Sequence, residues 1–257
     1  MGSHLRSLVR LLLYMKQFRF SRRIMLALQQ MKQRFKSVFF DVGNTLAYAD
    51  LAVTLHPLTK RGSHPTDAQL RNAEINARRS VDALYASGAQ PNPDTEYWKS
   101  FFDGLLGSLG VQDTEVLSEL TFEWRAARNW TRVLPGTAEV LQRLASKYDL
   151  AVISNADGTI GRLLKQVELA RFFRTVTDSG IVGVHKPSPE VFHLALESMQ
   201  TDPEESVYIG DSYSVDFLAA RAIGMQAVLF DGSGSYTDLD VPKVNHLVQL
   251  EKLLTNL

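Results

Sequence analysis

Short apolar runs alternate with helical stretches along most of this chain. The first run, Val38 to Phe40, ends at Asp41 before a turn that contains Gly43. A short apolar run followed by turn residues predicts a buried strand. Runs of the same kind predict four further strands, at Leu150 to Ile153, Phe173 to Val176, Val207 to Ile209, and Ala227 to Phe230. Because helical stretches separate these runs, the pattern predicts an α/β fold, with a doubly wound parallel sheet covered by helices on both faces.

The segment between the first and second predicted strands has no strand pattern. It predicts helices at Asp67–Ala86, Asp94–Leu106 and Thr114–Trp130. About eighty residues of helix directly after one strand do not fit within such a sheet and favour a second, smaller domain. We therefore expect an all-helical domain over residues 51–131, an α/β core formed by residues 37–50 and 132–257, and a basic N-terminal extension over residues 1–36.

The composition is typical of a globular protein. Hydrophobic residues make up 45% of the 257 residues and charged residues 22%, which is enough apolar material for a sizeable core. There is no cysteine, so disulfides, thiolate zinc sites and cysteine nucleophiles are excluded. This composition fits a reducing compartment, and we expect a cytoplasmic protein.

The charge balance is even overall but uneven along the chain. The whole chain has 28 basic and 28 acidic residues, yet the first forty carry nine basic residues and no acidic ones. Residues 41–257 are therefore net acidic, and they give no reason to expect nucleic acid as a partner. The basic, partly apolar N-terminal extension could contact an anionic membrane surface weakly or target the protein to an organelle. We favour the simpler interpretation that it is an additional helix packed on the core or a frayed extension.

Polar residues follow four of the predicted strands. In an open parallel sheet, ligands bind beyond the carboxyl ends of the strands. One such aspartate alone is commonly a helix cap, but carboxylates, a lysine and a hydroxyl together can hold magnesium and a phosphoryl group. The residues that would meet there are Asp41, Ser154, Asn155, Lys186, Asp211 and Asp216.

These residues belong to four segments that resemble the motifs of a known family. The segments are Asp41 to Leu46, Ser154-Asn155, Lys186 to Pro189, and Gly210 to Asp216. In order and spacing they resemble the four motifs of the haloacid dehalogenase superfamily of hydrolases. The resemblance extends from residue 37 to about 231 and implies a Rossmann-like core with an inserted helical cap of the C1 type. The cap resembles those of the branch named after the fly Reg-2 protein.

The resemblance implies a nucleophile and a metal site. Asp41 would attack phosphorus and form an aspartyl-phosphate. Asp41, Asp211 and the carbonyl group of Gly43 would bind Mg²⁺, which offsets the repulsion between a carboxylate and a phosphate dianion. Lys186 would neutralise charge on Asp41 and on the phosphoryl group, and Asp216 would orient Lys186 or a water molecule.

The resemblance also implies a binding site for a small phosphorylated metabolite. Ser154 and the backbone of Asn155 would hold phosphate oxygens, together with Asn44, Thr45 and Lys186. The identity of the substrate does not follow from these residues.

The sequence departs from the pattern of phosphatases in this family at one position. Such phosphatases usually carry a second aspartate two residues after the nucleophile, as general acid and base. Here that residue is Gly43, and the neighbouring Asn44 cannot titrate. General acid–base catalysis is worth about 10²–10⁴-fold, so we expect a weakened enzyme that prefers acyl, aryl or anhydride phosphates. Asp50, His56 or His64 could replace the missing acid.

Three other functions remain open. A haloacid dehalogenase also lacks the second aspartate, although the pair Gly210-Asp211 favours a phosphatase. A non-catalytic module that binds a phosphorylated ligand would explain Gly43. A phosphonatase would need a lysine from the helical domain, which offers Lys60 and Lys99.

Two groups of residues in the helical domain have helical spacing. We expect the aromatic group to pack in the core of that domain and the arginine group to form a solvated face. The aromatic group comprises Trp98, Phe101, Phe102, Trp124 and Trp130, and the arginine group Arg71, Arg78 and Arg79.

Overall fold

The computed structural model describes residues 34–89, 91–92, 95–125 and 129–257. The chain divides into two units, Met1–Arg34 and Phe35–Leu257, and the second contains the fold described below. Nearly all of the predicted N-terminal extension, residues 1–36, lies outside the described residues. Within the described residues, no helix has both the length and the apolar character needed to cross a membrane.

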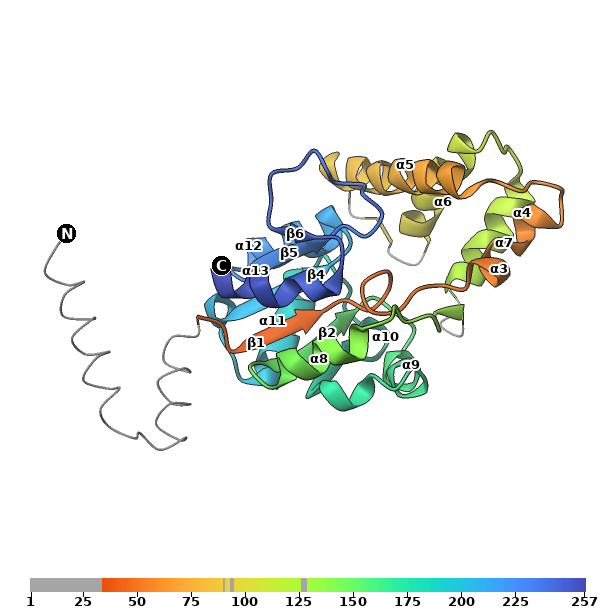
Figure 1. The fold of residues 1–257 in the computed structure, drawn as a ribbon. Helices are drawn as coiled ribbons and strands as arrows, with labels where there is room; N and C mark the ends of the chain where they lie inside the picture. The colour runs from red at the N-terminus through yellow and green to blue at the C-terminus, as the bar shows by residue number, and fades with distance from the viewer. Residues whose placement is uncertain (1–33, 90, 93–94, 126–128) are drawn as a thin grey trace, which may run out of the picture. The chain divides into compact units, whose positions relative to one another are not determined.

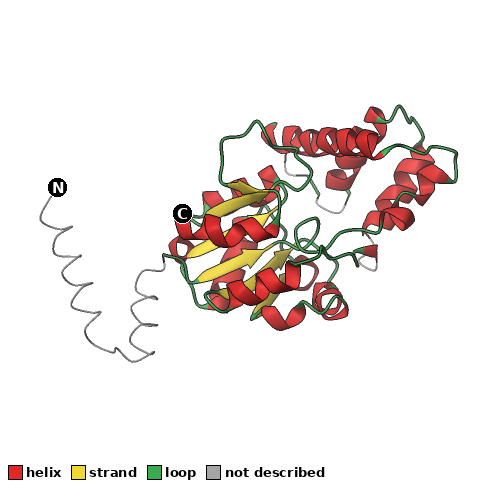
Figure 2. Cartoon of the chain, viewed as in Figure 1, coloured by secondary structure: helices red, strands yellow, loops and turns green. Residues whose placement is uncertain are grey.

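The core is a six-stranded parallel sheet, shown in yellow in Figure 2. Its strand order is β3-β2-β1-β4-β5-β6. The strands are β1 (Ser37–Phe40), β2 (Asp149–Ser154), β3 (Thr175–Asp178), β4 (Ser206–Gly210), β5 (Gln226–Phe230) and β6 (Lys243–Val244). The predicted α/β class and parallel sheet are confirmed. The sequence pattern missed β6, which has only two residues, and placed β3 two residues too early.

Alternate residues of the strands enter two different hydrophobic clusters. In β1, Val38 and Phe40 pack on one face of the sheet and Phe39 packs on the other. The helices that pack on the first face are α8 (Thr137–Ala145), α9 (Ile160–Gln166) and α13 (Leu250–Asn256). The helices on the second face are α11 (Pro189–Met199) and α12 (Ala219–Ala222). Both faces are therefore covered, as expected for a parallel sheet.

Five of the described helices between β1 and α8 form what we call the helical insert (Figure 1). They are α3 (Leu51–Thr54), α4 (His56–Thr59), α5 (Asp67–Ala86), α6 (Glu96–Ser108) and α7 (Thr114–Arg125). The bounds of α5 match the prediction, α6 is shifted by two residues, and α7 ends earlier. The two short helices α3 and α4 were not predicted.

The two ends of the helical insert lie side by side at the sheet. Tyr48 and Arg132 pair through two backbone hydrogen bonds of 2.7 and 3.1 Å. Within the insert, Gly104 of α6 lies so close to α5 that an added Cβ would be 3.0 Å from Ala77 Cα. This close approach lets the two longest helices pack directly against each other.

Short helical turns complete the fold. They are η2 (Ala170–Phe172), α10 (Ser179–Val182), η3 (Pro203–Glu205), the π-helical turn η4 (Tyr213–Leu218) and η5 (Leu247–Gln249). The turn η4 directly follows β4 and carries Asp216. Single π-helical turns are rare and frequently occur at functional sites.

Candidate active site

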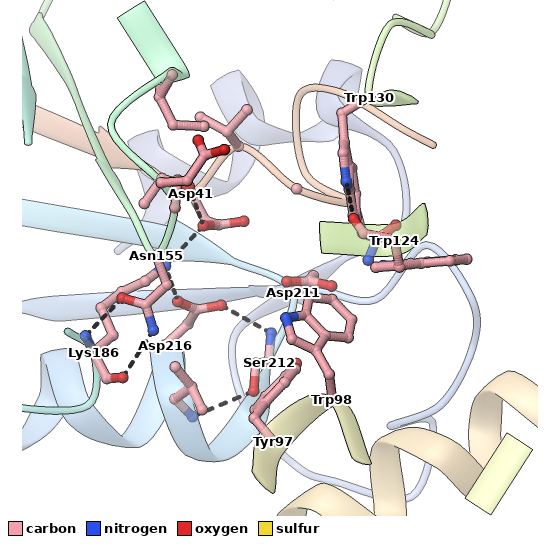
Figure 3. A pocket seen from close by; sticks show the side chains of 18 of the residues that line it. Asp41, Tyr97, Trp98, Trp124, Trp130, Asn155, Lys186, Asp211, Ser212 and Asp216 are labelled. Carbon is pink, nitrogen blue, oxygen red and sulfur yellow. Dashed lines mark hydrogen bonds and ion pairs between the residues drawn. The ribbon is translucent and has the colours of Figure 1, made fainter. Parts of the chain in front are cut away.

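A cavity of about 480 Å³ opens beyond the carboxyl ends of the central strands. The sheet side of its lining includes all six polar residues predicted to follow the strands: Asp41, Ser154, Asn155, Lys186, Asp211 and Asp216. Figure 3 labels all of them except Ser154 and marks hydrogen bonds and ion pairs between the residues drawn. The position of the cavity agrees with the general rule for ligand sites in open parallel sheets.

A tight loop after β1 holds Asp41 and the residues that follow it. The carbonyl oxygen of Val42 accepts hydrogen bonds from Leu46 N and Ala47 N, each of 2.9 Å. Asn44 has a positive φ of 53°, a conformation that asparagine tolerates well. Asn44 lines the cavity, but Thr45 does not. The Thr45 hydroxyl is fully buried and has no hydrogen-bond partner among the described residues.

Lys186 lies at the centre of a buried polar network. Its Nζ is 2.7 Å from Asp41 Oδ1, 2.7 Å from Asp216 Oδ1 and 2.8 Å from the Tyr208 hydroxyl. Tyr208 in turn donates to the carbonyl oxygen of Ile153 at 3.1 Å. All three protons of the ammonium group therefore have acceptors, which a buried cation requires. Tyr208 was not predicted as a site residue, because it lies within an apolar strand.

Asn155 positions Lys186 through its side chain. The Lys186 backbone N–H donates to Asn155 Oδ1 at 2.7 Å, and Asn155 Nδ2 donates to the Lys186 carbonyl oxygen at 2.9 Å. Ser154, in the preceding position, is buried, and its Oγ lies 3.5 Å from Asp41 Oδ1. The second predicted motif therefore orients the third, besides lining the cavity.

Burial and neighbouring charges shift the pKa values of the network. Burial raises the pKa of Asp41 to about 7; Lys186 opposes this shift, and the carboxylates of Asp216 and Asp211 add to it. Burial alone would lower the pKa of Lys186, but Asp216 and Asp41 outweigh it and hold that pKa above its usual value. Burial also raises the pKa of Asp211, against the opposing effect of Arg78. Burial thus disfavours the ionised carboxylates, and a fully ionised site would have three carboxylates facing two cations, Lys186 and Arg78.

Three carboxylates in this site have the arrangement of a metal site. One oxygen from each of Asp41, Asp211 and Asp216 lies within 4.8 Å of the others. Only two buried cations, Lys186 and Arg78, contact these carboxylates among the described residues. Carboxylate oxygens are the ligands that Mg²⁺ prefers, and a divalent cation would offset the excess negative charge. The residues present therefore fit a magnesium ion.

Arg78 connects the helical insert to this acidic group. Its Nη1 is 2.7 Å from Asp211 Oδ2 and 3.1 Å from the Asp211 carbonyl oxygen. Only 7% of Arg78 is exposed, so the expectation that it belongs to a solvated face was wrong. Arg71 is exposed and Arg79 pairs with Asp238. Helical spacing could not reveal the partner of Arg78, which lies 133 residues further along the chain.

Asp178 was also missed, and it shapes one wall of the cavity. Its carboxylate accepts hydrogen bonds from the backbone N–H groups of Gly158, Ile160 and Gly180 at 2.9 to 3.0 Å. These contacts hold the loop that carries Asn155 against the end of β3. The misplaced prediction of β3 hid Asp178, which is the last residue of the strand.

Because Gly210 has no side chain, the carboxyl group of Asp216 can pack directly against it. A Cβ atom at residue 210 would lie 2.5 Å from Asp216 Cγ. We expect Gly210→Ala to displace Asp216 from Lys186, to destabilise the protein by about 1–3 kcal/mol, and to lower activity. The matched control is Gly107→Ala on α6, where an added Cβ meets nothing within 4 Å. Thermal unfolding and activity of the two variants would test this; equal effects would contradict it.

Several predicted residues do not reach the cavity. Asp50 caps α3 by accepting from Ala52 N at 3.0 Å, and His56 and His64 are exposed. None of the three lines the cavity, so the structure does not support them as replacements for the missing acid. Lys60 and Lys99 also lie outside the lining, which removes the basis for a phosphonatase.

Aromatic side chains form the opposite side of the cavity. Phe101 and Phe102 are buried in the insert, as expected. Trp124 and Trp130 belong to the same buried cluster and Trp98 packs against it, which confirms the prediction, and all three also line the cavity. We call the aromatic residues that line the cavity the aromatic wall: Tyr97, Trp98, Phe122, Trp124 and Trp130.

The comparisons with known proteins agree with this geometry. A family model described as haloacid dehalogenase-like hydrolase matches residues 35–224. The chain belongs to this family. The chain is similar to the haloacid dehalogenase-like hydrolase domain-containing protein 3 of Xenopus laevis, with 32% identity over 66% of this chain and 72% of that protein. The resemblance inferred from the four motifs is confirmed.

Two further members of the family extend the comparison. The glyceraldehyde 3-phosphate phosphatase of Pyrococcus furiosus is 27% identical over 81% of this chain and 85% of that protein. The fold matches that of the putative HAD-hydrolase YfnB of Bacillus subtilis, solved with magnesium bound. That match has a TM-score of 0.64 and 20% identity and covers 86% of this chain and 99% of the other. The protein is therefore a hydrolase of this family, and its relatives include phosphatases.

Proposed function

We propose that the protein is a Mg²⁺-dependent phosphatase that acts on a small phosphorylated molecule through an aspartyl-phosphate on Asp41. The main support is the position of Asp41, which lies in the cavity 2.7 Å from Lys186 and next to two further carboxylates. A nucleophilic carboxylate needs such an environment, because it must approach a negatively charged phosphate. The sequence similarity to a glyceraldehyde 3-phosphate phosphatase also supports hydrolysis of a phosphate ester.

In the first step, an Asp41 carboxylate oxygen attacks phosphorus. A bond forms between that oxygen and phosphorus, and the bond to the leaving oxygen breaks with its electron pair. Lys186 holds Asp41 in place and offsets negative charge on it, while Ser154 and the backbone of Asn155 are placed to bind phosphate oxygens. Bound Mg²⁺ would supply positive charge that stabilises the phosphoryl group during transfer. Asp41, Asp211 and the Gly43 carbonyl group would hold it.

In the second step, water attacks phosphorus and releases Asp41 and inorganic phosphate. At residue 43, a second aspartate would remove the proton of that water, but glycine cannot. The loop after β1 therefore supplies neither a general acid for the first step nor a general base for the second. We expect the second step to be slow for this reason. Asp216 acts as a positioning residue, since its Oδ1 contacts Lys186 at 2.7 Å.

We further propose that the helical insert is a cap domain over residues 51–131. Its aromatic residues and the sheet residues line the same cavity, so a ligand in the cavity would contact both. The core would then comprise residues 37–50 and 132–257. Substrate choice would depend on the cap, because the sheet side of the cavity is occupied by the phosphoryl-transfer residues.

A metal titration tests the proposed cofactor. Mg²⁺ should stabilise the metal-free protein, by about 2.7 kcal/mol at a concentration one hundred times its Kd, and should be required for phosphatase activity. Asp211→Asn should reduce both effects. The matched control is Asp231→Asn, which alters a buried aspartate after β5 that lies outside the cavity lining. Full activity in excess chelator would refute metal dependence.

A substrate panel separates the proposed function from its alternatives. Acetyl phosphate, aryl phosphates and sugar phosphates would be assayed for phosphate release beside 2-haloacids for halide release. Phosphate release that requires Asp41 supports the proposal. Halide release without metal would establish a dehalogenase, and binding of phosphate without turnover of any substrate would establish a non-catalytic module.

A further inference from the structure

The position of the missing acid is filled by an aromatic ring. A Cβ atom added to Gly43 would lie 3.2 Å from Trp130 Cζ3 and 3.4 Å from Cη2. The Trp130 ring is itself fixed, because its Nε1 donates to the Trp124 carbonyl oxygen at 2.8 Å. Its edge-to-face contact with Trp124 has a ring separation of 5.6 Å. The loop after β1 therefore has an indole where an acidic side chain would otherwise project.

The cavity has two chemically distinct sides, seen together in Figure 3. The sheet side carries Asp41, Asp211, Asp216 and Lys186. The helical insert and the segment that returns from it contribute only the aromatic wall to the described lining. Within these described residues, no charged side chain of the insert lines the cavity. The part of a substrate beyond the phosphoryl group would therefore lie against aromatic rings.

This lining discriminates between classes of leaving group. The aromatic wall offers the hydroxyl groups of a sugar only the Tyr97 hydroxyl and the indole N–H groups of Trp98 and Trp124 as side-chain partners among its described residues, and leaving hydroxyl groups without partners is costly. A planar aromatic group would instead make stacked or edge-to-face contacts with the indoles. Tyr97 and Trp98 of the wall already show edge-to-face packing with each other, at a ring separation of 4.9 Å.

The same class of leaving group needs the missing acid least. A phenol has a pKa of about 10, the ordinary value of the tyrosine side chain, so a phenoxide can leave without a proton. An alkoxide is far more basic and depends on a general acid. The absence of an acid at Gly43 and the presence of the Trp130 ring beside it therefore favour the same type of substrate, an aryl phosphate.

Building on the proposed function, we propose that the substrate is a phosphate monoester of a phenol, with its planar ring held by the aromatic wall. Asp41 forms a bond to phosphorus as the bond between phosphorus and the phenolic oxygen breaks. The electron pair stays on the phenoxide, which takes its proton from water. Trp98 and Trp130 act as specificity-determining residues.

Four substrates separate recognition of the ring from leaving-group ability. Phenyl phosphate has both the ring and a good leaving group, and benzyl phosphate has the ring with an alkoxide. Acetyl phosphate has a good leaving group without a ring, and glycerol 3-phosphate has neither. We expect KM values roughly tenfold or more lower for the two aromatic esters. We also expect a high kcat for phenyl phosphate and acetyl phosphate only.

Variants of the wall test the same inference. Trp98→Leu should lower the ratio of kcat/KM for phenyl phosphate to that for acetyl phosphate by roughly tenfold, and Trp98→Phe should restore most of it. Gly43→Asp should lower this ratio too, because its side chain requires space now held by Trp130. For the natural protein, phenylphosphonate should inhibit more strongly than methylphosphonate, and this measurement needs no variant.

The outcomes distinguish this inference from the proposed function. Hydrolysis of acetyl phosphate that requires Asp41, combined with equal KM values for phenyl phosphate and glycerol 3-phosphate, would overturn the aromatic substrate and leave the phosphatase standing. Equal inhibition by the two phosphonates would also overturn it. Absence of phosphate release from all four substrates would overturn the proposed function itself.

Discussion

Replacing Asp41 with asparagine should lower phosphate-ester turnover by about 10⁴-fold or more while leaving the fold intact. Asparagine has nearly the same shape, and its side-chain oxygen can still accept the hydrogen bond that Lys186 Nζ now makes at 2.7 Å. It lacks the anion that attacks phosphorus. Single-turnover and steady-state phosphate release would measure the loss, with circular dichroism to check the fold.

The control for Asp41→Asn is again Asp231→Asn, which makes the same change at a strand end outside the cavity. It should retain most of the activity. Trapping a phosphorylated aspartate in the natural protein but not in Asp41→Asn would support the covalent mechanism. If Asp41→Asn turned over at the natural rate, another group would have to be the nucleophile.

Replacing Lys186 with methionine should destabilise the protein by about 3–5 kcal/mol and abolish activity. The substitution removes the ammonium group that lies between Asp41 and Asp216 and leaves two buried carboxylates facing each other. For a domain of this size, such a loss lowers Tm by roughly 6–20 °C. Lys165→Met is the matched control, because Lys165 is exposed on α9 and should have little effect on Tm.

A double-mutant cycle makes the Lys186 prediction specific. If the cost arises from unpaired buried charge, adding Asp216→Asn to Lys186→Met should recover part of the lost stability. Additive destabilisation in the double variant would instead indicate that Lys186 contributes through packing. Thermal unfolding of the two single variants and the double variant decides between the two cases.

The parts of the fold that the sequence predicted are those with strong local patterns. The long helix α5 and strands β1, β2, β4 and β5 have apolar runs or clear ends, and these were found. Strand β6 has two residues and the helices α3 and α4 have four each, so none of them has a repeating pattern to detect. These short elements depend on the contacts around them more than on their own residues.

In the candidate site, the residues on the sheet side were predicted and those that depend on distant contacts were not. Its sheet side was predicted because the ends of parallel strands converge by geometry alone. Arg78 comes from the insert and Trp130 from the segment that returns from it, and their positions over the sheet depend on how the insert packs on the core. Tyr208 was missed for a different reason, since a buried tyrosine in a strand differs from its apolar neighbours only by one hydroxyl group that finds partners across the sheet.

The aromatic wall gives the protein a built-in optical reporter. The chain has three tryptophans, and all three line the cavity. Its intrinsic indole fluorescence therefore arises entirely next to Asp41 and Asp211. A ligand that enters would change the water exposure of these rings, so binding could be followed without a label in the natural protein. For the same reason, each tryptophan variant changes the signal, and an independent measure of binding should accompany it.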